Sequence, residues 1–114
     1  MIDVAVAIDK EAIPLVLRRK GEATYTLSGD VVPGGMVETP FSGALLALAL
    51  ERYGDMLKDR MEGIAVDGLR MLYSRTPVEI DDIVLHLSQA YRVLALWPRY
   101  EGGFHRAAVG RLKT

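Results

Sequence analysis

The side chains best suited to metal binding are few and lie far apart in the sequence. His86 and His105 are the only histidines, and neither stands in an HxH or HExxH pattern. A metal site would need Asp or Glu partners that only the fold could bring beside them. The chain has no cysteine, which removes thiolate nucleophiles and cysteine-bound metals. We therefore expect no metal site, with His86 on one face of a strand.

The adjacent residues Asp81 and Asp82 could serve as an acid–base pair only if the chain bends between them. Neighbouring strand residues point to opposite faces, so the pair predicts a polar turn before a strand. No serine stands in a G-x-S-x-G context, and Gly34-Gly35 lacks the Lys-Ser/Thr of a phosphate-binding loop. We expect no enzyme activity and no cofactor. An enzyme or ligand-binding domain assembled from distant loops stays open, with these candidates: His86, His105, Asp67, Asp81 and Asp82.

Length and composition indicate one globular domain over residues 1–114. Half of the 114 residues are apolar, a quarter are charged, and the net charge is −1, which excludes a disordered tail. The longest apolar run, residues 44–50, is far shorter than the ~20 residues of a membrane-spanning helix. The N-terminal stretch carries acids and alternates apolar with polar residues, so we expect no signal peptide and no membrane contact.

Alternating apolar and polar residues predict antiparallel strands in the second half of the chain. The segments 83–87, 91–97 and 104–112 each alternate, with short polar or glycine-rich turns between them. This pattern predicts a three-stranded meander, with Tyr91, Val93 and Trp97 all facing the core. Upstream, Asp67-Gly68 between apolar residues predicts another hairpin turn.

The first half predicts a hairpin followed by a loop. Residues 15–19 and 23–27 alternate, and Lys20-Gly21 between them can turn. Ser28-Gly29-Asp30 and Pro33-Gly34-Gly35 then interrupt the pattern, and the second triplet should be a mobile loop.

The segment Phe41–Tyr53 fits either a helix or a strand. Its residues are good helix formers, but large Leu alternates with small Ala over 46–50, which suits a strand covered on both faces. We favour a strand from about Glu38 to Tyr53, with a bulge or bend at Gly43. A loop or short helix should follow from Gly54 to Gly63. Together these elements predict an all-β fold, a small antiparallel β-barrel or sandwich with at most one short helix and long mobile loops.

Charge is unevenly distributed. Residues 51–82 hold eight acids and five bases, whereas residues 92–114 hold five bases and one acid. Two surfaces of opposite sign could dock neighbouring copies, although solvated strand edges and a slightly basic tail would give the same pattern. The arginines could also serve a nucleic-acid-binding barrel, against which the net charge argues. The candidate assembly surface comprises Arg92, Arg99, Arg106, Arg111, Asp55, Asp59 and Glu62.

The second half also carries a familiar order of short motifs. The mainly apolar stretch over 64–74 leads to a Pro-containing turn, then Asp82 before a strand, Tyr91-Arg92-Val93, a glycine turn and a last strand ending near Arg111. This order resembles the small head–tail joining proteins of tailed bacteriophages, the neck or stopper components. Asp82, Tyr91 and Val93 match best, and Asp81-Asp82 stands where such proteins often have Gly-Asp.

The resemblance implies a structural virion protein of a phage or prophage. Such a protein is a small β-barrel, monomeric alone, that forms a ring beneath the portal, joins the DNA-filled head to the tail and helps retain packaged DNA. Its partners would be other phage structural proteins on the portal or adaptor side and on the tail side, with DNA nearby. Its location would be the virion, and the host cytoplasm before assembly. A tail terminator or minor tail protein and a small nucleic-acid-binding β-barrel remain alternatives.

Overall fold

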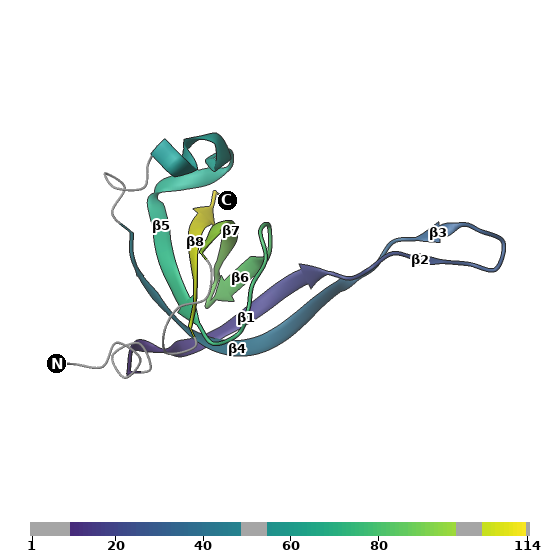
Figure 1. The fold of residues 1–114 in the computed structure, drawn as a ribbon, viewed down its shortest axis with the longest axis horizontal. Coiled ribbons are helices and arrows are strands. Elements are labelled where there is room, and N and C mark those ends of the chain that lie inside the picture. Colours follow the sequence, from purple (N-terminus) through teal and green to yellow (C-terminus); the bar gives the residue numbers. More distant parts are fainter. Residues whose placement is uncertain (1–9, 49–54, 98–103, 114) are drawn as a thin grey trace.

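Figure 1 shows the computed structural model, which describes residues 10–48, 55–97 and 104–113. Six strands close into an antiparallel barrel in the order β1-β4-β5-β8-β7-β6, and β2 and β3 form a separate two-stranded sheet. The predicted all-β fold is confirmed, and it is a barrel. The strands are β1 Ile13–Lys20, β2 Thr24–Tyr25, β3 Val31–Val32, β4 Met36–Ala47, β5 Ile64–Ser74, β6 Ile83–His86, β7 Gln89–Trp97 and β8 His105–Leu112.

The main core gathers buried residues from five strands of the barrel and from the loop before β6. Strand alternation brings every second side chain to the same face, so β1, β5, β6, β7 and β8 each supply at least one buried residue. Closure pairs the barrel strands with one another and removes most open edges. The cluster consists of Leu15, Leu17, Leu72, Val78, Val84, Tyr91, Val93, Ala107 and Val109.

A second buried cluster packs on the other face of β5, β7 and β8. Residues 55–57 are helical and continue into the 3-10 helix η1, Lys58–Arg60, which confirms a short helix in this stretch. Leu57 is fully buried against Ala108 and its neighbours. Trp97 packs against this cluster, because the register of β7 on β8 shifts between Val93 and Ala95 and an extra residue exchanges the two faces. The expectation that Trp97 shares a face with Tyr91 is wrong.

β5 runs as one strand through Asp67-Gly68, so the hairpin turn predicted there is wrong. Its register with β8 shifts between Ile64 and Leu69. A Cβ atom at Gly68 would lie 2.5 Å from Cβ of Arg111. Gly68 therefore permits a close approach of β8 at an irregular point of β5, and the Asp-Gly pair does not reverse the chain.

β4 links two neighbours in the barrel. Met36–Gly43 pairs with β1, and Gly43–Ala47 pairs with β5, so the strand interpretation is confirmed for residues 36–47. The pairing is continuous through Gly43, and the bulge expected there is absent. Figure 1 shows β4 curving along its length, with Gly43 at the point where it passes from one partner strand to the other. The remaining part of the expected strand, residues 49–53, lies outside the described residues.

β1 and β4 continue outward as a projecting hairpin, residues 20–37, which we call the arm (Figure 1). β1 pairs with β4 along its whole length, from Ile13–Gly43 to Lys20–Met36. The hairpin turn predicted at Lys20-Gly21 is therefore wrong, since the chain runs on into β2 and returns through β3. With the arm, the molecule is 61 Å long but only 28 by 27 Å across.

Candidate assembly surface

The arm presents apolar side chains that have no barrel beneath them. β2 and β3 pair only with each other, through Thr24–Val32 and Tyr25–Val31. Apolar patches above a few hundred Å² are uncommon on monomeric proteins and mark surfaces that another molecule covers. The exposed large apolar residues of the arm are Tyr25, Leu27, Val31, Val32, Met36 and Val37.

The tip of the arm is a hydrogen-bonded turn. The amide of Thr26 donates to the carbonyl oxygen of Asp30 at 2.8 Å, and the amide of Gly29 donates to the carbonyl oxygen of Thr26 at 3.0 Å. The amide of Asp30 also donates to Oγ1 of Thr26 at 3.1 Å. Leu27 sits within this turn with a relative exposure of 111%. The arm thus ends in a preorganised apolar group.

The two sides of the arm come close together where they leave the barrel. The amide of Gly21 donates to the carbonyl oxygen of Gly35 at 2.8 Å. A Cβ atom at Gly34 would overlap the backbone of Gly21, so this approach requires glycine. Pro33, Gly34 and Gly35, predicted as a mobile loop, lie on the returning side of the arm.

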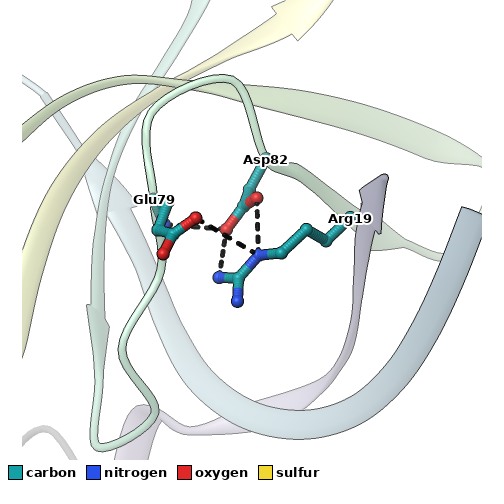
Figure 2. Close-up of polar contacts among 3 residues, drawn as sticks. All are labelled: Arg19, Glu79 and Asp82. Carbon is teal, nitrogen blue, oxygen red and sulfur yellow. Dashed lines mark hydrogen bonds and ion pairs between the residues drawn. The ribbon is translucent and has the colours of Figure 1, made fainter. Parts of the chain in front are cut away.

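An ion pair fastens the base of the arm to the barrel. Figure 2 shows Arg19 near the end of β1 and Asp82 just before β6 facing each other. Nε of Arg19 donates to Oδ1 of Asp82 at 3.0 Å, and Nη2 donates to Oδ2 at 2.7 Å. Glu79 adds a longer contact of 3.7 Å between its Oε2 and Nε of Arg19. This bidentate geometry is the strongest form of an Arg–carboxylate pair.

Asp82 holds its own loop as well as Arg19. It is only 4% exposed, and its Oδ2 accepts the amide of Glu79 at 2.7 Å. Its carbonyl oxygen accepts the amide of Val93 at 2.9 Å. The preceding residue, Asp81, has a φ of 72°, which is uncommon for a residue other than glycine. The expected polar turn is present, but Asp82 is a buried anchor within it.

The hydrogen bonds that Arg19 donates to Asp82 raise the pKa of its guanidinium above the ordinary value, and the charges of Asp82 and Glu79 act in the same direction against the opposing effect of burial. Arg19 therefore stays cationic at every pH at which the protein is folded.

The residues that best match the phage neck proteins gather beside this anchor. Tyr91 and Val93 are both buried in the main core, and Val93 bonds to Asp82 through its amide. The carbonyl oxygen of Val93 accepts the amide of Asp81 at 3.0 Å. Asp82 and Val93 therefore meet beside the base of the arm, whereas Tyr91 lies in the main core.

Within the predicted assembly surface, the basic and acidic residues meet inside one chain. Nη2 of Arg92 donates to the carbonyl oxygens of Arg60 at 3.3 Å and Glu62 at 2.9 Å. Asp59, Glu62 and Arg92 line the same hollow of about 250 Å³. Arg92 thus steadies the segment after η1, and this part of the charge pattern forms contacts within the fold.

The other residues of that surface are spread over the barrel. Nη2 of Arg111 pairs with Oδ1 of Asp67 at 2.9 Å, and the guanidinium of Arg106 lies 4.8 Å from the centre of the Trp97 ring. Asp55 is exposed at the start of the helical segment. Arg99 lies outside the described residues.

The candidates for catalysis are not brought together. His86 lies on β6 and His105 on β8, with β7 between these strands. Asp67 is on β5 and pairs with Arg111. Across residues 10–48, 55–97 and 104–113, no group of three or more His, Asp or Glu side chains could hold a metal ion. In the same ranges, we find no helix with the length and hydropathy needed to cross a membrane.

Sequence reasoning missed the arm and its anchor, although one signal was available. Leu15, Leu17 and Arg19 share one phase of the β1 alternation, and both leucines are buried. An arginine in the inward phase of a strand needs a carboxylate partner, which is Asp82.

No protein-family model matches the chain, and no curated protein matches it.

Proposed function

We propose that this protein is a structural component of the neck of a tailed phage or prophage. In this role it joins the DNA-filled head to the tail and helps retain packaged DNA, without catalysis. The observation that carries the proposal is the exposed, apolar arm anchored rigidly to a small closed barrel. A barrel with a projecting arm suits assembly, because the barrel supplies a stable body and the arm supplies surface for a neighbour.

The motif order of the second half supports the same proposal. Of the positions that resemble neck proteins, Asp82 pairs with Arg19 at the base of the arm, Val93 bonds to Asp82, and Tyr91 is buried in the main core. The proposed partners are other copies of the chain in a ring, the portal or adaptor on one side and the tail on the other.

Electron microscopy of lysates from an induced host lacking the gene tests the proposal. Filled heads beside separate tails of normal length are the expected result. Tails of irregular length would move the protein to tail termination, which is the alternative role within the virion. Unchanged, infectious particles would overturn a role in the virion.

A binding assay with purified protein separates the nucleic-acid alternative. That alternative requires affinity for DNA or RNA that falls steeply with salt. Arg92 and Arg111 make contacts within the chain, so we expect no measurable binding to a double-stranded DNA oligomer at low salt. Tight, salt-sensitive binding would favour a nucleic-acid-binding barrel.

A further inference from the structure

A second unpartnered apolar group lies away from the arm, in the turn between β6 and β7. His86 pairs with Gln89, so Leu87 and Ser88 form a two-residue turn. Leu87 has a φ of 55° and a relative exposure of 91%. A first turn position with positive φ normally belongs to glycine, and a bulky residue there is strained. An exposed leucine kept in a strained conformation suggests a contact with another molecule.

The pairing register places this turn at the end of the barrel away from the arm. β1 runs toward the arm, and β6 runs antiparallel to it, with Ile83 opposite Arg18 and Leu85 opposite Val16. Leu87 follows Leu85 in the same direction, so it lies past Val16 and away from Lys20. The arm and Leu87 therefore present exposed apolar side chains toward opposite ends of β1.

We infer that the arm of one copy docks on the β6–β7 turn of a second copy, with Leu27 and Leu87 in the same contact region. Two different patches on each copy make a head-to-tail contact, which is the kind that builds a ring. The inference deepens the proposed function, since it names the contact between copies on which the proposed ring depends.

The area available fits a second copy. Full burial of one such side chain removes roughly 100 Å² from water, so the six exposed apolar residues of the arm supply on the order of 600 Å². A stable interface buries about 800 Å² on each partner. The apolar residues of the arm thus supply most of the area that one side of such an interface needs. The length of the arm also matches, because the molecule is 61 Å long and a neighbouring barrel is about 28 Å wide.

Disulfide trapping tests the contact directly, because the chain has no cysteine of its own. Purified Leu27→Cys and Leu87→Cys variants are mixed under mild oxidation at high protein concentration. We expect the mixed disulfide dimer to form at least about tenfold faster than either homodimer. The matched control pairs Leu27→Cys with Met56→Cys, because Met56 is an exposed apolar residue of the helical segment.

Each outcome decides the inference. Preferential trapping of Leu27→Cys with Leu87→Cys supports the head-to-tail contact. Equal rates with the Met56→Cys control overturn it, and so does dominance of the Leu27→Cys homodimer, which would indicate arms that pair with each other. Trapping uses purified protein, so its result does not depend on the role in the virion. If the disulfide forms as expected but the gene deletion leaves the phage particles unchanged, the neck role is rejected and the contact between copies stands.

A variant at the turn separates contact from folding. Leu87→Gly suits the positive φ and should raise the melting temperature. It should also lower the association constant between copies, measured by sedimentation at high protein concentration, by about tenfold or more. Mixing it with the double variant Tyr25→Ser/Leu27→Ser should restore dimers, since each partner keeps one intact half of the contact. Unchanged self-association of Leu87→Gly, or failure of the mixture to form dimers, would contradict the inference.

Discussion

The barrel and the arm share one hairpin, formed by β1 and β4, yet they use their apolar side chains in opposite ways. In the barrel, alternate residues such as Leu15 and Leu17 are buried. In the arm, Tyr25, Val31 and Val32 are exposed, although they too are residues that favour strands. The difference lies in what surrounds the strands, since the barrel closes on itself and the arm has only its own two sides.

An isolated two-stranded hairpin is at best marginally stable in water, so the arm must be held at its ends. The turn at Thr26–Asp30 holds the tip, and the Arg19–Asp82 pair holds the base. Polar contacts therefore stabilise the conformation of the arm, whereas apolar burial stabilises the barrel. Stability measurements can separate these two modes.

The largest difference should come from matched leucines. Leu72 is 1% exposed within the core, so Leu72→Ala should lower the free energy of unfolding by about 2–5 kcal/mol. Leu27→Ala in the arm should change it by less than about 0.5 kcal/mol. Urea unfolding followed by circular dichroism measures both. Similar losses for the two variants would mean that the arm packs on the barrel.

The anchor should show the next largest effect. Asp82→Ala removes the acceptor of both Arg19 and the Glu79 amide, and should destabilise the fold by about 1–3 kcal/mol. The control is Glu38→Ala, which breaks the exposed pair of Glu38 with Arg18 and should cost less than about 1 kcal/mol. Equal losses of unfolding free energy for the two variants in chemical denaturation would show that the Asp82 contact stabilises the fold no more than an exposed ion pair does.

Leu87→Gly should be the one stabilising change. It relieves a left-handed conformation that costs roughly 1–2 kcal/mol in a residue with a Cβ atom, and part of this gain is lost to the greater freedom of glycine in the unfolded chain. We expect a net gain of up to about 1 kcal/mol by thermal unfolding. Ser88→Gly is the control at the neighbouring turn position, and a gain there alone would be inconsistent with strain at Leu87.

Removal of the whole arm should change the stability of the barrel little. Lys20 and Met36 face each other across the hairpin, so Asn-Gly can replace residues 21–35 as a two-residue turn. The shortened protein should unfold within about 1 kcal/mol of the full chain, because surface changes have small effects. Hydrogen exchange should also show faster exchange in the arm than in β7 and β8 of the full chain. A barrel that fails to fold would show that the arm belongs to its core.

The same comparison explains which parts of the fold could be predicted from sequence. Strands β6, β7 and β8 lie where the alternation indicates them, because β7 pairs with its chain neighbours β6 and β8. The turn signals at Lys20-Gly21 and Asp67-Gly68 were misleading. At both, the chain continues, since pairing with a distant strand outweighs a local preference.

The candidate site was harder to predict, because its parts are distant in the sequence. Arg19 and Asp82 are 63 positions apart, and no spacing rule connects them. The charge pattern suggested Arg92 as part of an assembly surface, and its hydrogen bonds to the backbone of Arg60 and Glu62 could not be foreseen from it. The exposure of the arm could not be predicted from sequence, because it depends on the barrel closing without β2 and β3.

The anchor at the base of the arm has a geometric consequence for any assembly. In a head-to-tail assembly, the angle at which the arm leaves its barrel fixes the rotation from one copy to the next. Only certain rotations close the assembly into a ring, and the others give an open helix. Two hydrogen bonds between one guanidinium and one carboxylate help to hold β1 at the base of the arm, beside its pairing with β4. A substitution such as Arg19→Lys, which keeps the charge and loses the planar two-point contact, would therefore loosen the curvature of the whole assembly and broaden the number of copies that it contains.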